Sequence, residues 1–149
     1  MKIRPARPEE AAALSELCFR SKAYWGYDDA FMDACREELM VNPSEIERRR
    51  VTVAELNGTI VGLYALDDDP PTGDVGLFFV SPEAIGTGVG RVLWDAMIAR
   101  AREFGFKSLS IDADPNAEGF YLRMGAVRVG EAPSGSIPGR VLPHLGFRL

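Results

Sequence analysis

The stretch FFVSPEAIGTGVGRVLWDAMIARAR, residues 78–102, joins an apolar run to a short turn, a glycine at every second position and an amphipathic helix. Gly86, Gly88 and Gly90 let the backbone approach a ligand closely, because no Cβ atom stands in the way. The helix that follows leaves its first N–H groups unpaired at the positive end of its dipole, where a phosphate or pyrophosphate binds. The stretch therefore predicts a phosphorylated cofactor.

The segments after the glycines alternate between helix and strand. The face of the first helix that we expect to be buried comprises Val89, Val92, Leu93, Ala96 and Met97. Gly105 ends this helix, and Gly125 stops a shorter one. The expected order downstream is a strand at 108–113, the short helix at 116–124, a strand at 126–130 and a last strand at 141–148.

The segments before the glycines begin with a strand at 2–7 and a helix that starts at Pro8. The inner face of this helix is expected to comprise Ala11, Leu14, Leu17 and Cys18. The segment SKAYWGYDD, residues 21–29, breaks the helix, and Asp28 or Asp29 caps a second one. The inner face of the second helix is expected to comprise Phe31, Ala34, Cys35 and Leu39.

A hairpin and a strand lie between the second helix and the glycines. Residues 51–56 and 59–66 flank Asn57-Gly58, a strong signal for antiparallel pairing. A turn at 67–74 leads to a strand at 75–80, which should pair in parallel with the strand that follows the helix. We therefore predict an α/β fold with a mixed sheet, in a single domain spanning residues 1–149.

Composition narrows the class of protein. The formal net charge of −5 argues against a nucleic-acid partner, and no apolar run reaches the roughly 20 residues that span a bilayer. Cys18 and Cys35 fall on core-facing helix positions, so we expect buried thiols with neither a disulfide nor a metal. The N-terminus shows no secretory signal, and we expect a cytoplasmic protein with no membrane partner.

Three nucleotide-binding patterns compete for the glycine loop. A Walker loop is excluded, because Gly90 is followed by Arg91-Val92 and not by Lys-Ser or Lys-Thr. A dinucleotide-binding loop fits poorly, because the spacing is Gly-x-Gly-x-Gly and the loop lies mid-chain behind an antiparallel hairpin. The third is a loop that binds the pyrophosphate of coenzyme A.

In this third pattern the chain resembles the GCN5-related N-acetyltransferase (GNAT) superfamily, over nearly its whole length. Val80-Ser81-Pro82 before residues 85–90 is similar to the family's pyrophosphate motif. Residues 114–125, DPNAEGFYLRMG, resemble its downstream Asn-x-x-Ala-x-x-x-Tyr-x-x-x-Gly pattern. The resemblance implies a sheet of six or seven mostly antiparallel strands with one parallel pair at the cofactor site, about four flanking helices, and acetyl transfer from acetyl-CoA to an amine.

Cofactor contacts follow from the resemblance residue by residue. Backbone groups of Phe78, Phe79 and Val80 would pair with the pantetheine arm. The pyrophosphate would lie on Ile85, Gly86, Thr87, Gly88, Val89, Gly90 and Arg91. The family's Arg or Gln is Ile85 here, so backbone amides must carry that contact. The family's Asn is Asp114, with Asn116 two residues on, and which of them touches the pantetheine stays open.

The catalytic groups are expected on two segments. Tyr121 matches the tyrosine that protonates the leaving sulfur, and a neutral phenol suits that role. The position where many relatives carry a glutamate base is Gly76, so Asp74 on the same strand is the candidate, acting directly or through water. His144, the only histidine, is a weaker candidate.

The acceptor site should use two loops that the motifs leave over. One carries Tyr24, Trp25 and Tyr27, and the other contains Ser136 and Arg140, whose charge would suit a carboxylate or phosphate on the acceptor. We expect a small-molecule amine as acceptor, with a homodimer left open. The alternatives are a transferase for peptide amines, which would need an open groove, and a non-catalytic acyl-CoA sensor, which the missing glutamate would allow.

Overall fold

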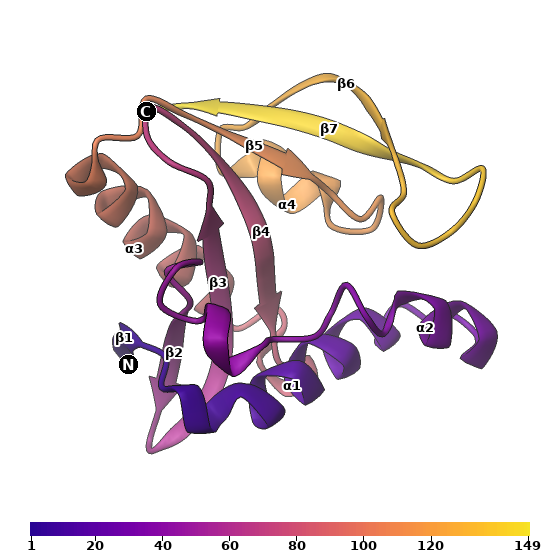
Figure 1. Cartoon of the computed structure of the whole chain (residues 1–149), viewed down its shortest axis with the longest axis horizontal. Helices are drawn as coiled ribbons and strands as arrows, with labels where there is room; N and C mark the ends of the chain where they lie inside the picture. The colour runs from indigo at the N-terminus through magenta and orange to yellow at the C-terminus, as the bar shows by residue number, and fades with distance from the viewer.

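The computed structural model describes residues 1–149 and is built around one seven-stranded sheet with the strand order β1-β2-β3-β4-β5-β7-β6 (Figure 1). The strands are β1 (Lys2–Pro5), β2 (Thr52–Leu56), β3 (Thr59–Asp67), β4 (Thr72–Val80), β5 (Ser108–Asp112), β6 (Val127–Pro133) and β7 (Val141–Arg148). The α-helices are α1 (Ala11–Ala23), α2 (Asp29–Cys35), α3 (Val89–Phe104) and α4 (Glu118–Arg123). Short 3-10 turns cover Pro8–Glu10, Pro43–Glu45 and Pro82–Ala84.

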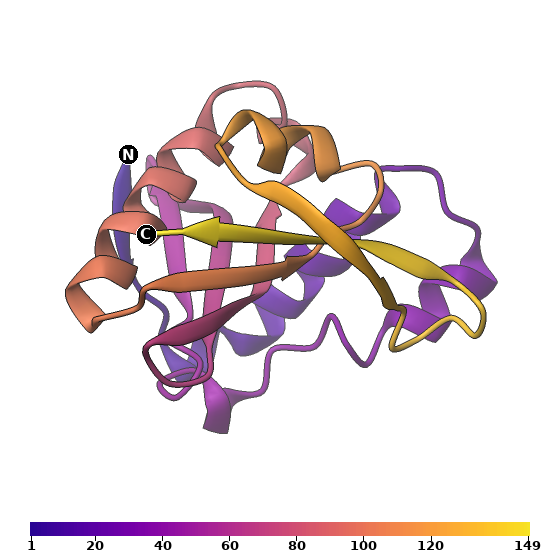
Figure 2. The same cartoon turned by 90° about the horizontal axis from the view of Figure 1, so that it is seen from above.

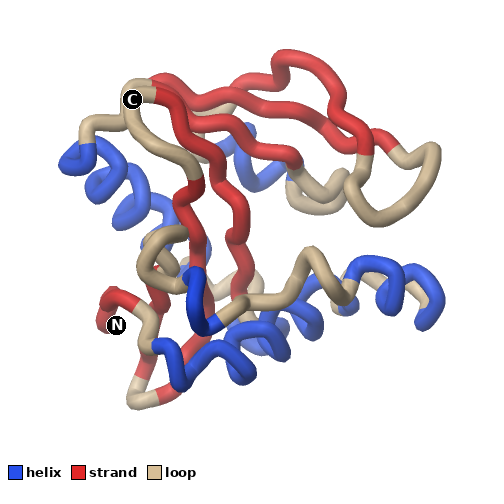
Figure 3. The backbone as a smooth tube through the Cα atoms, viewed as in Figure 1, coloured by secondary structure: helices blue, strands red, loops and turns tan.

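All neighbouring strands are antiparallel except β4 and β5. The parallel pairing of β4 with β5 lasts only from Thr72 to Asp74 on β4, opposite Ser108 to Ser110 on β5. Beyond these residues the two strands separate, as the tube in Figure 3 also shows. The predicted mixed sheet with one parallel pair and four helices is confirmed, and the separation opens a space inside the sheet.

Helices cover the two faces of the sheet, and each face has its own apolar core (Figures 1 and 2). Leu93 and Met97 of α3 and Tyr121 of α4 belong to one core, and Leu14 and Cys18 of α1 belong to the other. The second core also buries Cys35 of α2, and both cysteines are unpaired and buried, as predicted. None of the helices combines the length and the apolar composition that crossing a bilayer requires.

The structure confirms the predicted turn and cap residues. Asn57 (φ 52°) and Gly58 (φ 80°) both have left-handed backbone, which is the conformation that the tight hairpin between β2 and β3 requires. The side chain of Asp28 caps α2 by accepting a hydrogen bond from the Phe31 N–H at 2.8 Å. Gly105 (φ 92°) ends α3, and Gly125 (φ 104°) follows α4.

Several helix and strand boundaries differ from those predicted. The first helix continues to Ala23, so residues 21–23 do not break it. Strand β4 begins at Thr72, which places Asp74 in the sheet and not in a turn. Predicted strand 2–7 ends at Pro5, predicted helix 116–124 begins at Glu118, and predicted strand 126–130 runs on to Pro133.

Two apolar side chains assigned to the core point to solvent instead. Val92 is 45% exposed and Ala34 is exposed, whereas Trp94 and Met32 are buried. The reason is the rotation of each helix. The buried seam of α3 follows Val89, Leu93, Trp94, Met97, Ile98 and Ala101, and Val92 lies one residue outside it.

Candidate active site

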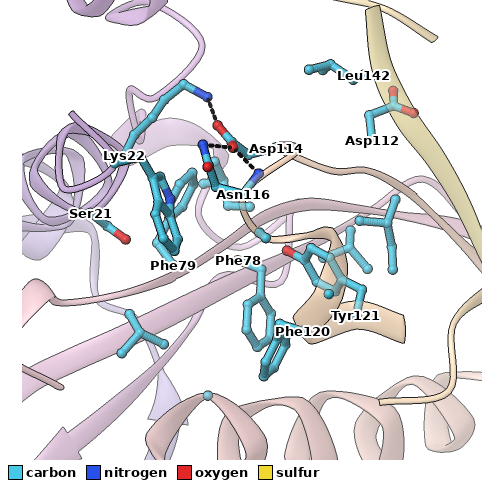
Figure 4. Close-up of a pocket in the computed structure, with 18 of the residues that line it drawn as sticks. Ser21, Lys22, Phe78, Phe79, Asp112, Asp114, Asn116, Phe120, Tyr121 and Leu142 are labelled. Atoms are coloured by element: carbon cyan, nitrogen blue, oxygen red, sulfur yellow. Dashed lines mark hydrogen bonds and ion pairs between the residues drawn. The ribbon is translucent and has the colours of Figure 1, made fainter. Parts of the chain in front are cut away.

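A cavity of about 730 Å³ lies where β4 and β5 separate. One wall is β4 from Asp74 to Val80, and the opposite wall is the end of β5 with the segment up to Asn116. Side chains of α1, α4 and the β6–β7 loop complete the lining (Figure 4). The cavity therefore gathers residues from most of the chain around one open strand edge.

The edge of β4 that faces the cavity has no partner strand after Asp74. Its backbone N–H and C=O groups are consequently free to pair with an extended ligand, in the way that an added strand would. Phe78, Phe79 and Val80, which the sequence assigned to pantetheine binding, all lie on this part of β4 and line the cavity.

The glycine loop lies at the end of this edge. Gly86 (φ 81°) and Gly88 (φ 90°) have left-handed backbone, whereas Gly90 is helical and leaves room for the Phe120 ring, which would lie 3.2 Å from a Cβ atom there. No acceptor in the protein pairs with the N–H groups of Gly86, Gly88 or the first three residues of α3. Unpaired donors at a helix N-terminus can bind an anion, so the geometry is compatible with the predicted pyrophosphate contact.

The side chains around the loop sort into two groups. Ile85 and Arg91 line the cavity, and so does Arg123, which the sequence analysis did not single out. Neither arginine forms an ion pair within the protein. The Thr87 hydroxyl donates to the Ala84 carbonyl, and Val89 is buried in the core, so these two could act only through their backbone.

Tyr121 of α4 projects its hydroxyl into the cavity from a ring that is otherwise buried (Figure 4). Its ring packs against Phe78, Trp94 and Phe120, with centroids 5.4–5.9 Å apart. Burial, with a smaller contribution from the charge of Asp114, raises the pKa of the phenol well above its ordinary value. No protein group bonds this hydroxyl, so it is a protonated donor available to a ligand.

Asp74 lines the cavity where β4 and β5 part, and its carboxylate accepts a hydrogen bond of 2.7 Å from the Ser110 hydroxyl. Burial raises the pKa of Asp74, Ser110 opposes that shift, and the nearby charge of Asp112 adds to it. The Asp74 carboxyl is thus less acidic than usual, and this property suits a proton acceptor.

At Gly76, where the resemblance led us to expect a carboxylate base, two side chains occupy the space that a larger residue would need. A Cβ atom there would lie 1.8 Å from Oδ2 of Asp67 and 2.6 Å from the Arg49 guanidinium. Arg49 binds Asp67 through two hydrogen bonds of 2.8 Å, so this ion pair fills the volume in question. A side chain at position 76 would therefore have to displace this ion pair.

Asp114 is the centre of a partly buried polar network that joins three segments. It accepts hydrogen bonds from Lys22 of α1 (3.2 Å) and from the Tyr27 hydroxyl (2.8 Å), and Arg140 of the β6–β7 loop lies 3.6 Å away. Burial opposes ionisation, but the hydrogen bonds from the Asn116 N–H and Tyr27, with the Lys22 charge, hold the pKa of Asp114 below its ordinary value. The network fixes the loops over the cavity.

Arg140 and Tyr27 are hydrogen-bonded within this network, so neither points unpaired toward a ligand. The Arg140 guanidinium donates to the Tyr27 hydroxyl at 2.9 Å and lies over the Phe31 ring, 4.8 Å from its centroid. Arg140 lines the cavity, but its charge is matched by Asp114, which the sequence could not indicate. Asn116 donates its side-chain amide to Tyr27 and Asp114, and nothing in the protein occupies its amide oxygen.

The remaining candidates are divided between the cavity and its surroundings. Trp25 lines the cavity, whereas Tyr24 is half exposed beside it and Ser136 lies outside, bonded through its N–H to Ser134. His144 also lies outside the lining, and its Nδ1 is 2.6 Å from the Asp112 carboxylate. The structure therefore does not bring Tyr24, Ser136 or His144 to the cavity wall.

Sequence reasoning missed Ser21, Lys22 and Asp112, all of which line the cavity. Ser21 and Lys22 were placed in a loop, yet they follow Cys18 by three and four residues and continue the buried stripe of α1. Asp112 alternates with the buried Ile111, so its side chain faces the opposite side of β5. Continuing each periodic pattern by one step would have found them.

Comparisons with known proteins agree with this geometry. The family model described as acetyltransferase (GNAT) domain matches residues 9–134. A GCN5-related N-acetyltransferase structure from Rhodopseudomonas palustris is 25% identical, with a TM-score of 0.81, 99% of this chain and 95% of that one covered. The PaiA N-acetyltransferase of Thermoplasma acidophilum, in complex with coenzyme A, has a TM-score of 0.83 at 16% identity, with 99% and 98% covered. The search of curated proteins gave no significant match.

Proposed function

The chain belongs to the acetyltransferase (GNAT) domain family, and on that premise we propose that it transfers the acetyl group of acetyl-CoA to the primary amine of a small molecule. The observation that carries this proposal is the open edge of β4 leading to the unpaired N–H groups of the glycine loop. A free strand edge suits the amide groups of pantetheine, and the loop suits a pyrophosphate. Coenzyme A joins these two chemical parts in one molecule.

The proposed site residues have two roles: some bind acetyl-CoA and others transfer protons. The edge formed by Phe78, Phe79 and Val80 holds the pantetheine, and one of its N–H groups polarises the carbonyl oxygen. Asn116 is better suited than Asp114 to accept a hydrogen bond from pantetheine, because its amide oxygen is free while Asp114 is bonded to Lys22 and Tyr27. Acetyl-CoA supplies the activated acetyl group as a thioester.

Tyr121 is the proposed acid. As the new C–N bond forms and the C–S bond breaks, the sulfur needs a proton, and the Tyr121 hydroxyl is unbonded and faces the cavity. Its raised pKa keeps it protonated at neutral pH. The phenolate left behind regains its proton from solvent before the next turnover.

Asp74 is the proposed base, taking the proton that the amine loses on attack. It lies on the strand that borders the cavity, and its raised pKa makes its carboxylate a better acceptor than an exposed one. Six residues separate it from Val80, about 20 Å along an extended strand, so the proton is expected to reach Asp74 through several water molecules in the cavity. The Asp67–Arg49 ion pair fills the volume that a base at position 76 would need.

The acceptor is proposed to be small, because the β6–β7 loop closes over the cavity. Arg140 ties that loop to Tyr27 and Asp114, and the Glu38 carboxylate lies 3.7 Å from where a Cβ atom of Gly135 would be. A peptide would need an open groove at this position. This roof favours a small molecule over a peptide chain.

The test is to incubate the protein with acetyl-CoA and two amine libraries, one of small molecules and one of peptides, and to measure free thiol and acetylated product. We expect product from small amines, and much less from Tyr121→Phe. Product from peptides alone would overturn the small-molecule assignment. Binding of acetyl-CoA with no acetylated product from either library would overturn catalysis and leave a binding module.

A further inference from the structure

Lys22 and Arg140 share one carboxylate, that of Asp114, and all three side chains line the cavity (Figure 4). Oδ2 of Asp114 lies 3.2 Å from Nζ of Lys22 and 3.6 Å from Nη2 of Arg140, so the two cations are neighbours. The lowered pKa of Asp114 keeps it ionised at neutral pH, and the raised pKa of Tyr27 keeps that phenol neutral. The network therefore carries one net positive charge.

The hydrogen-bond acceptors of this network are fully used. Oδ2 of Asp114 accepts from Lys22 and from the Tyr27 hydroxyl, and Oδ1 accepts from the N–H and the side-chain amide of Asn116. These bonds use the roughly four lone-pair sites of a carboxylate. The Tyr27 oxygen in turn accepts from Asn116 and from Nη2 of Arg140. The remaining N–H groups of the Lys22 ammonium, with Nε and Nη1 of Arg140, have no acceptor in the protein.

The other carboxylates of the cavity lining do not supply the missing acceptors. Asp74 is bonded to Ser110 and Asp112 to His144, while Glu38 is exposed to solvent and forms no ion pair. The Lys22 side chain is only 9% exposed, and an ammonium buried to this degree is normally paired and hydrogen-bonded. Its spare donors are on the cavity wall, so a ligand with anionic oxygen atoms would complete them.

We infer that the acceptor is an amino acid in the broad sense, whose carboxylate binds the Lys22 ammonium group beside Arg140 while its amine is acetylated. This inference rests on the proposed function and narrows its substrate class. A carboxylate fits because its single negative charge equals the surplus of the network, and its two oxygen atoms can accept from both cationic groups. The anion is thus held chiefly by Lys22, which the sequence analysis did not single out.

The test measures acetylation of a panel of amino acids, from glycine through longer ω-amino acids and including the common L-amino acids. Each is compared with its carboxamide, which has nearly the same shape and no charge, after correction for the fraction of neutral amine. For the best acceptor we expect kcat/KM to exceed that of its carboxamide by about 10- to 100-fold, the range for hydrogen bonds between charged groups. Phosphoethanolamine is compared with β-alanine, because a phosphate carries more charge than the network can match.

Two variants locate the carboxylate. Lys22→Met and, separately, Arg140→Gln should each lower the acid-to-carboxamide ratio of kcat/KM, and Lys22→Met should lower it most. Lys107→Met makes the same chemical change at an exposed position outside the cavity lining and should leave the ratio unchanged. Arg140→Gln keeps the test decisive if Lys22→Met disturbs folding, because the Arg140 side chain is more exposed, at 19%.

The outcomes separate this inference from the proposed function. Equal kcat/KM for acids and carboxamides, or a preference for phosphoethanolamine over β-alanine, would overturn the inference while acetyl transfer stands. An equal fall of the ratio in Lys107→Met would overturn it too, because the effect would then come from net charge. So would a Lys22→Met variant that binds coenzyme A more weakly and keeps its ratio, since the spare donors would then serve the cofactor. Absence of product from every amine tested would overturn the proposed function and the inference with it.

Discussion

At the glycine-loop end most of the lining comes from one continuous segment, which contributes Ile85, Gly86, Gly88, Gly90 and Arg91. At the end near Asp74 the cavity is lined by side chains from separate parts of the chain. Glu38 follows α2, Asp112 ends β5, and Arg140 belongs to the loop before β7. The first end binds through a local backbone shape, and the second through charges that only folding brings together. The predictions below test this division.

The largest effect is expected at the junction of the two ends, where Tyr121 faces the cavity. Tyr121→Phe keeps the ring and its packing against Phe78 and Trp94 and removes only the hydroxyl. We expect kcat to fall by about 10- to 1000-fold, with the affinity for coenzyme A little changed. Steady-state kinetics and calorimetry measure the two quantities. An unchanged kcat would mean that Tyr121 only packs and that the thiolate leaves unassisted.

Gly88→Val should weaken binding at the glycine-loop end of the cavity. No protein atom lies within 4 Å of a Cβ atom there, so the fold should survive, but φ is 90° and strains any branched residue. We expect the dissociation constant of coenzyme A to rise by roughly 10- to 100-fold, corresponding to about 1.4–3 kcal/mol of strain and lost contact. The matched control is Gly26→Val, which has the same φ of 90° in a loop outside the cavity lining. If calorimetry on the folded Gly88 variant gives wild-type affinity, the loop is not the pyrophosphate site.

The loops over the acceptor end depend on Asp114. Asp114→Asn leaves the buried Lys22 without its anion, and we expect the free energy of unfolding to fall by about 1–3 kcal/mol. Because the folded pKa of Asp114 is lowered, its contribution is present above the unfolded pKa and is lost as the pH falls through the folded pKa. Urea unfolding at neutral and acid pH measures this. Equal losses at both pH values would show that ionisation of Asp114 does not stabilise the fold.

The smallest kinetic effect is expected at Asp74, because the proton reaches it only through several water molecules. Asp74→Asn should lower kcat/KM at neutral pH by about tenfold, just below the usual range for one acid–base group, and should remove the acidic limb of the pH profile. The folded pKa of Asp74 is raised, so its ionisation costs stability as the pH rises through that value, and the variant should unfold at a slightly higher temperature at neutral pH. A wild-type profile in the variant would exclude Asp74 and direct attention to His144, to a water chain that leads to bulk solvent or to an acceptor with a low amine pKa.

Gly76→Glu is the converse of the Asp74 test. The new side chain would overlap the carboxylate of Asp67, so we expect a loss of stability and no gain in rate. A faster enzyme would mean that the Asp67–Arg49 pair moves aside and that a base at position 76 remains compatible with this chain.

The sequence predicted the fold well where its signals are local. The Asn57-Gly58 turn, the Asp28 cap and the glycines after α3 and α4 act within a few residues and were read correctly. The errors fell where a boundary depends on packing. Ser21 was predicted to lie in a loop because polar and aromatic residues follow it, but α1 continues to Ala23 and packs against β4. Val92 looked buried because it is apolar, but the rotation of α3 is set by Trp94.

The sequence by itself determined the backbone geometry of the glycine-loop end, because left-handed glycines and unpaired helix N–H groups follow from residues that are neighbours along the chain. Only the tertiary structure decided which side chains are available at the end near Asp74. Whether Arg140 is free depends on Asp114 and Tyr27, and whether position 76 can hold a side chain depends on Asp67 and Arg49. Charge pairing and excluded volume are properties of atoms brought together from distant segments, and a linear pattern does not contain those distances.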